Sequence, residues 1–175
     1  MSALLEREAA RPPQELSVPT TMRIRKRNGA LEPADLNKIL RAIGRCCEGL
    51  DKVDAVRVAT KTISGVYDGA STKELDELSI QTAAGLTAEE PQYSRLAARL
   101  LATCIDKEVE NQGIHSFSQS LQAGEAAGLI GRRLAAFAAE HRRKLDDAVD
   151  ASRTEAFEYF GLRTLYDRYL LRHPQ

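Results

Sequence analysis

The sequence has no tryptophan, no net charge and no long apolar run, and two of these absences exclude whole classes of protein. No stretch reaches the roughly 18 consecutive apolar residues that a transmembrane helix needs. The 25 lysine and arginine residues balance 25 aspartate and glutamate residues, which excludes a general polycation that coats nucleic acid or membranes. Three scattered cysteines, Cys46, Cys47 and Cys104, are too few for a disulfide framework. We therefore expect a reducing, cytoplasmic location and no metal site.

The first 21 residues combine charged residues with Pro12, Pro13 and Pro19. They contain no apolar stretch of the kind that a secretory signal requires. We therefore expect residues 1–21 to form a disordered leader ahead of the first folded element.

A short β-hairpin is expected directly after this leader. Apolar residues alternate with arginines over residues 22–27, which is the period of a half-exposed strand. Asn28-Gly29 then favours a type I′ turn. Residues 30–32 would form the return strand, which Pro33 ends.

Four amphipathic helices are expected after the hairpin. Asp35 caps the first, which closes at Gly49, and the second covers about residues 52–66. Ser71 or Thr72 caps the third, and Pro91 lies in the first turn of the fourth, which fades near residue 112. Apolar residues at helical spacing should form the buried faces: Leu36, Ile39, Leu40, Ile43, Val53, Val56, Ala59, Thr60, Ile63, Val66, Leu75, Leu78, Ile80, Ala83, Leu86, Tyr93, Leu96, Ala97, Leu100, Leu101, Cys104 and Ile105. The predicted fold class is mainly α, with a small β-hairpin sheet on a four-helix domain over residues 22–112.

The second half of the chain predicts further helices over residues 116–126 and 129–139, followed by an aromatic segment at 157–171. That segment holds five of the nine aromatic residues, and such side chains need a surface to pack against. The neighbouring predicted helices are mostly alanine. We therefore expect residues 113–175 to be the truncated beginning of a larger helical domain.

Basic residues gather at the hairpin, since residues 22–38 contain five lysines and arginines against two acidic residues. Cations on a hairpin that leads into a helix N-terminus can bind a polyphosphate, because the first helical turn adds free backbone N–H groups. A solvated strand face or a small nucleic-acid patch would have the same composition. Composition by itself leaves these three interpretations open.

Residues 24–39, IRKRNGALEPADLNKI, resemble the opening of an ATP-cone, the nucleotide-sensing module of many ribonucleotide reductase large subunits. The shared pattern is a lysine-arginine pair, a polar-glycine turn, an acidic residue three positions after the glycine, and Asp-x-x-Lys-Ile. Tyr67-Asp68-Gly69, Thr72, Tyr93, residues 96–100 and Lys107 follow in the order and spacing of that family. Residues 157–170 are similar to the segment that leads into the catalytic barrel of class I reductases.

The resemblance implies a role for each residue of a nucleotide site. Lys26, Arg27 and Lys107 would hold the phosphates, with Thr72 adding a hydroxyl. Glu32 and Asp35 would accept protons from the adenine amine and repel the O6 of guanine. Ile24, Ala34 and Ile39 would surround the base, and Lys38 would contact either phosphate or the base edge.

Asp76 is a departure from the family, because some members carry histidine at this position. An aspartate would repel the phosphates unless it faces away or pairs with Lys73 or another cation. Its effect on the choice between ATP and dATP stays open at this point.

The implied function is allosteric sensing of ATP and dATP, with Mg²⁺, by the large subunit of a ribonucleoside-diphosphate reductase. The implied partners are the radical-generating small subunit and other large subunits, without nucleic acid or membrane. In the class I family the catalytic cysteines lie on the barrel, beyond residue 175. No catalytic residue is therefore expected here, and the chain alone should be inactive.

Three alternatives accompany this interpretation. The first is the ATP-cone of an anaerobic reductase, which should lack the match at residues 157–171. The second is a transcriptional repressor that joins an ATP-cone to a zinc ribbon, but the sequence has no Cys-x-x-Cys pair. The third is a helical interaction module without nucleotide, in which Arg132-Arg133 and residues 142–144 would contact a partner.

Overall fold

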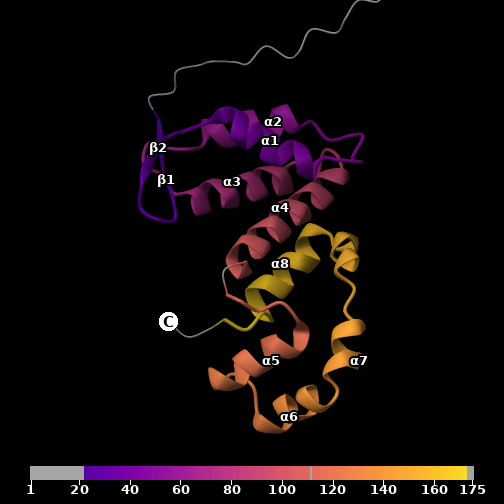
Figure 1. Ribbon diagram of the computed structural model, residues 1–175. Coiled ribbons are helices and arrows are strands. Elements are labelled where there is room, and N and C mark those ends of the chain that lie inside the picture. Colours follow the sequence, from indigo (N-terminus) through magenta and orange to yellow (C-terminus); the bar gives the residue numbers. More distant parts are fainter. Residues whose placement is uncertain (1–21, 111, 173–175) are drawn as a thin grey trace, which may run out of the picture.

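The computed structural model describes residues 22–110 and 112–172, so the expected leader at residues 1–21 lies outside the described part of the chain. The hairpin and the first four helices pack together, while α5–α7 lie beyond them and α8 returns against α4 (Figure 1). The predicted class, mainly helical with a small N-terminal sheet, is confirmed. The elements are β1 (Arg23–Arg25), β2 (Leu31–Pro33), α1 (Leu36–Cys46), α2 (Ala55–Ser64), α3 (Thr72–Gly85), α4 (Gln92–Val109), α5 (Phe117–Ala126), α6 (Arg132–Glu140), α7 (Arg142–Asp147), the 3₁₀ helix η1 (Ala151–Ala156) and α8 (Tyr159–Arg168).

The hairpin is antiparallel, with Ile24 opposite Glu32. The first strand is shorter than the alternation predicted, and the return strand has the predicted length but lies one residue later, so that it includes Pro33. The N–H of Lys26 donates to the carbonyl of Ala30 at 2.8 Å, and the N–H of Gly29 donates to the carbonyl of Lys26 at 2.9 Å. Gly29 has a φ of 84°, whereas no described non-glycine residue has a positive φ. The predicted type I′ turn is therefore wrong. The loop has three residues, so only the closing glycine needs the left-handed conformation.

Local capping signals fix where the helices begin. The Asp35 carboxylate accepts the N–H groups of residues 37 and 38, and Ser71 forms a reciprocal capping box with Glu74. The hydrogen bonds from Ser71 and Tyr67 lower the pKa of Glu74 to about 2, so this carboxylate is ionised at neutral pH. Asp35 and Ser71 thus act as the helix caps that the sequence predicted.

One core joins α1–α4, and Leu162 of α8 belongs to it. The predicted inward face of α2 is partly wrong, because Val56 is 59% exposed and Thr60 is exposed. The residues that α2 buries are Val58, Ala59 and Thr62. Because α2 packs against both α1 and α3, tertiary packing selects a face one position away from the expected one. The predicted burial of the Leu36 side chain lies outside what the structure describes.

Thr62 provides a test of this packing, because its side chain is fully buried and its hydroxyl oxygen has no hydrogen-bond partner among the described residues. A buried hydroxyl without a partner is destabilising, so Thr62→Val should raise the free energy of unfolding by about 1 kcal/mol. Chemical denaturation of the chain would measure the change. The matched control is Thr60→Val on the exposed side of α2, which should leave stability unchanged. Equal effects of the two substitutions would contradict the assigned face.

The C-terminal half contains three short helices that pack on one another, α5, α6 and α7. Asp146 of α7 accepts hydrogen bonds from the backbone N–H and the hydroxyl of Ser118, both at 2.8 Å, and so fastens α7 to the start of α5. Helix α6 begins at Arg132 rather than at the predicted residue 129. The reason is that the N–H groups of Leu129 and Ile130 fold back onto the carbonyl of Gly124 to close α5.

The aromatic segment has a partner that the sequence did not predict. Helix α8 packs along α4, burying Leu162 and half-burying Tyr159 and Tyr166. Phe160 and Tyr169 remain exposed. The segment is therefore attached to the four-helix domain through one face only.

Candidate nucleotide site

A cleft of about 1110 Å³ opens between the hairpin, α1, α3 and α4. The free edge of β1 fixes the hairpin here, because the N–H of Arg25 donates to the carbonyl of Ala70 and the N–H of Gly69 donates to the carbonyl of Arg23, both at 2.8 Å. These bonds hold the hairpin loop beside the start of α3. Eight residues of the predicted site line the cleft: Lys26, Arg27, Glu32, Lys38, Ile39, Thr72, Asp76 and Lys107.

Three residues of the predicted site are not among the lining residues. Ile24 and Ala34 are 5% and 8% exposed and form, with Ala70, a small core beneath the hairpin. One oxygen of the Asp35 carboxylate accepts N–H groups at 2.9 and 3.1 Å as the cap of α1, and the other lies 3.9 Å from a nitrogen of Arg41. These residues position the hairpin and α1 around the cleft.

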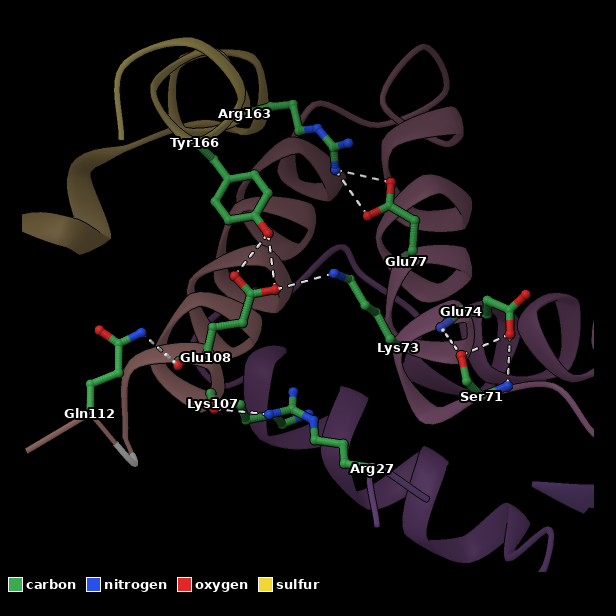
Figure 2. A network of polar contacts seen from close by, with 10 residues as sticks. All are labelled: Arg27, Ser71, Lys73, Glu74, Glu77, Lys107, Glu108, Gln112, Arg163 and Tyr166. Carbon is green, nitrogen blue, oxygen red and sulfur yellow. Dashed lines mark hydrogen bonds and ion pairs between the residues drawn. The ribbon is translucent and has the colours of Figure 1, made fainter. Parts of the chain in front are cut away.

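The three cations that the sequence assigned to the phosphates come from opposite ends of the four-helix domain. An Nη of Arg27 donates to the backbone carbonyl of Lys107 at 2.9 Å, which joins the hairpin loop to the end of α4 (Figure 2). Lys26 Nζ lies 3.2 Å from Glu32, and Lys107 Nζ lies 3.0 Å from Asp76. Both ion pairs are partly exposed to solvent, and such pairs contribute little to stability. A more highly charged anion can therefore displace the carboxylates from these lysines.

Asp76 pairs with a cation, one of the arrangements that the sequence left open. Both of its oxygens accept hydrogen bonds from Lys107, at 3.0 and 3.2 Å. Lys73, the other partner considered, lies 3.7 Å from Glu108 instead. The negative charge of Asp76 is thus balanced within the cleft.

The far end of the cleft holds residues that sequence reasoning did not assign. Arg99 donates to the carbonyls of Cys46 and Glu48, at 3.1 and 2.6 Å, and so binds the end of α1 to α4. Arg99, Thr103 and Lys107 follow one another at four-residue spacing, a stripe on α4 that could have signalled this wall. Residues 154, 155 and 157 also line the cleft, and no local pattern places that distant segment there.

The cysteines are free thiols within the helical core. Burial raises the pKa of Cys46, and it raises that of Cys104 to about 12, to which the charge of Asp76 contributes. Burial likewise raises the pKa of Cys47 to about 11. All three are protonated at neutral pH and act as small apolar residues. Over residues 22–110 and 112–172 no group of three or more His, Cys, Asp or Glu side chains could hold a metal ion.

These features define a class, a small helical domain whose β-hairpin closes a cleft lined by lysine and arginine side chains together with carboxylates. The ATP cone domain model matches residues 22–108, which include the hairpin and nearly all of α4. The chain is also 35% identical over 159 residues to the ribonucleoside-diphosphate reductase large chain of Schizosaccharomyces pombe, which covers 86% of this chain and 20% of the relative. It is 36% identical over 155 residues to the large subunit of Caenorhabditis elegans, covering 84% of this chain and 20% of the relative.

The chain therefore contains an ATP-cone domain and is homologous, over most of its length, to ribonucleoside-diphosphate reductase large subunits. It spans about a fifth of the length of these relatives. In the part of the chain that the structure describes, no helix is long and apolar enough to cross a membrane.

Proposed function

We propose that this chain binds ATP and dATP in the cleft as allosteric effectors. The observation that carries the proposal is the contact between Arg27 and Lys107, which brings cations 80 positions apart in the sequence to one wall of the cleft. Three cations suit a triphosphate with about four negative charges, because charge-assisted hydrogen bonds are the strong ones. The ATP-cone match supports the same ligand class.

Each predicted residue that lines the cleft has a part in this proposal. Lys26, Arg27 and Lys107 bind the phosphates, and Thr72 adds its hydroxyl at the start of α3, where backbone N–H groups favour an anion. When phosphate replaces Glu32 as the partner of Lys26, the Glu32 carboxylate becomes available to accept the adenine amine.

The remaining residues of the predicted site complete the proposed pocket. Ile39 forms the apolar wall against the base, and Lys38 is a fourth cation on the same wall. Ile24 and Ala34 support the hairpin from beneath, and Asp35 holds the first turn of α1.

Mg²⁺ is proposed to enter with the nucleotide. Magnesium usually keeps several waters and is bound by substrate phosphates with one or two carboxylates. Asp76 is a carboxylate inside the cleft that suits this role once Lys107 turns to the phosphates.

We further propose that the chain is the regulatory part of a ribonucleoside-diphosphate reductase large subunit. Residues 22–112 would be the ATP-cone, and residues 113–175 would begin the catalytic domain. The complete protein would reduce ribonucleotides for DNA synthesis together with a small subunit and further large subunits. ATP would maintain that activity and dATP would suppress it. The relatives, which match most of this chain, support this assignment.

The alternatives are less well supported. The anaerobic alternative does not explain why the relatives are named ribonucleoside-diphosphate reductases, nor why they match more of this chain than the ATP-cone alone. A helical module that binds no nucleotide gives no reason for the contact that brings Arg27 and Lys107 together in the cleft.

Nucleotide selectivity tests the proposal. Calorimetric titration with ATP, dATP and GTP at fixed Mg²⁺ should show binding of both adenine nucleotides, with GTP at least about tenfold weaker, because a carboxylate repels the guanine O6. Glu32→Gln should reduce the preference for adenine nucleotides over GTP, since the side-chain amide of glutamine can donate to the guanine O6. Glu125→Gln, an exposed substitution on α5, is the control and should not change it. Absence of adenine-nucleotide binding would overturn the proposed function, and equal affinity for GTP would overturn the role of Glu32.

A further inference from the structure

Two turns of helix connect the cleft to α8, one on α3 and one on α4. On α3, Asp76 holds Lys107 inside the cleft, whereas its neighbour Glu77 accepts two hydrogen bonds from Arg163 of α8, each at 2.9 Å. On α4, the neighbour of Lys107 is Glu108, which accepts from the hydroxyl of Tyr166 at 2.9 and 3.0 Å (Figure 2). Each turn is therefore held from two sides.

Lys73 connects the two turns on the side that faces α8. Its Nζ lies 3.7 Å from Glu108, which already accepts from Tyr166 (Figure 2). Lys73 and Glu77 are four residues apart and so share one face of α3. Thr72 and Asp76 have the same spacing, and both line the cleft. Helix α3 thus presents one stripe to the nucleotide site and the adjacent stripe to the network with α8.

Helix α8 is itself firmly placed. Leu162 is 7% exposed within the main core, and the N–H of Tyr159 donates to the hydroxyl of Ser94 on α4 at 3.3 Å. Asp167 accepts from Nε of Arg163 at 2.8 Å, while Nη1 of the same guanidinium donates to both oxygens of Glu77. A planar guanidinium held at two of its nitrogens by two carboxylates is fixed in orientation as well as in distance.

We propose that α8 is a positioning element of the nucleotide site, in which Arg163 and Tyr166 set the orientation at which Asp76 and Lys107 meet the phosphates. Neither side chain is among the residues that line the cleft, so both act through Glu77 and Glu108. The inference rests on the proposed function, because it names the segment that senses occupancy of that site. Linkage makes the effect reciprocal: if α8 strengthens nucleotide binding, bound nucleotide strengthens the docking of α8 by the same factor.

Calorimetric titration with dATP and Mg²⁺ of the parent chain, Arg163→Ala and Glu77→Gln tests the proposal. Both variants should bind about fivefold more weakly than the parent. Glu77→Gln is the more informative variant, because it removes a negative charge near an anion site. A purely electrostatic effect would therefore tighten dATP binding, whereas loss of the contact with Arg163 should weaken it. Arg168→Ala is the matched control, since it removes an exposed cation from the same helix, and it should stay within about twofold of the parent.

Hydrogen exchange supplies a second measurement, and a general loss of stability would not produce the result that we expect from it. Saturating dATP should slow exchange of the amides of residues 162–168 in the parent but not in Arg163→Ala. Glu77→Gln keeps the shape of the side chain, so it remains informative if Arg163→Ala does not fold. Affinities of Glu77→Gln and Arg163→Ala equal to or tighter than that of the parent would overturn the role of α8, as would an equal loss in Arg168→Ala. If the parent itself binds no nucleotide, the proposed function fails with it.

Discussion

Replacing Lys26 and Arg27 together by alanine is expected to weaken dATP binding by about a hundredfold. In the proposed site each cation would make a charge-assisted hydrogen bond to phosphate, worth about 1.5–3 kcal/mol, so losing both would remove about 3 kcal/mol or more. Lys26 would exchange a partly exposed carboxylate for the phosphates, which requires little rearrangement of the hairpin. Calorimetric titration of the folded double variant would measure the loss.

The matched control is Arg23→Ala with Arg25→Ala, which removes the same charge from the same hairpin. These two side chains are exposed and are not among those that line the cleft, and Arg23 instead lies 3.8 Å from Asp68. A general electrostatic field would make both double variants equally weak, whereas a defined phosphate site predicts a large loss in the first only. Parent-like affinity in Lys26→Ala, Arg27→Ala would exclude the proposed phosphate contacts.

The features that sequence predicted well are those decided by neighbouring residues. Asp35 and Ser71 each cap the helix that follows them, because a short polar side chain reaches the free N–H groups of its own first turn. The glycine of the hairpin loop and the class of fold follow from the same short-range rules. Of the eleven residues that resemblance to the ATP-cone assigned to a nucleotide site, eight line the cleft.

The features that sequence missed depend on contacts between distant elements. The buried face of α2 is selected by two helices at once, so Val58 is buried whereas Val56 is exposed. Arg163 reaches Glu77 across 86 positions, and only the packing of α8 on α4 brings the two together. No rule based on the spacing of residues along the sequence predicts a contact between Arg163 and Glu77.

The core that supports the cleft is tested by Leu96→Ala. Leu96 is fully buried in α4, the helix that contacts α1, α3 and α8 and carries Lys107 to the cleft. The substitution should lower the free energy of unfolding by about 2–5 kcal/mol, since it leaves a cavity at the centre of the packing. Leu134→Ala is the matched control. Because Leu134 is 49% exposed on α6, this substitution should lower the free energy of unfolding far less. Chemical denaturation would compare them, and equal losses would contradict the assigned core.

Nucleotide should restore part of the stability that Leu96→Ala removes. A ligand that binds only the folded state adds about 2.7 kcal/mol at a concentration one hundred times its Kd. Saturating dATP should therefore raise the unfolding midpoint of Leu96→Ala, and at the same concentration it should raise that of a Leu96→Ala, Lys26→Ala, Arg27→Ala triple variant far less. Equal rescue of both variants would mean that dATP stabilises the chain from somewhere other than this cleft. Rescue of the first alone would tie the packing of α4 to the occupancy of the site that its last turn completes.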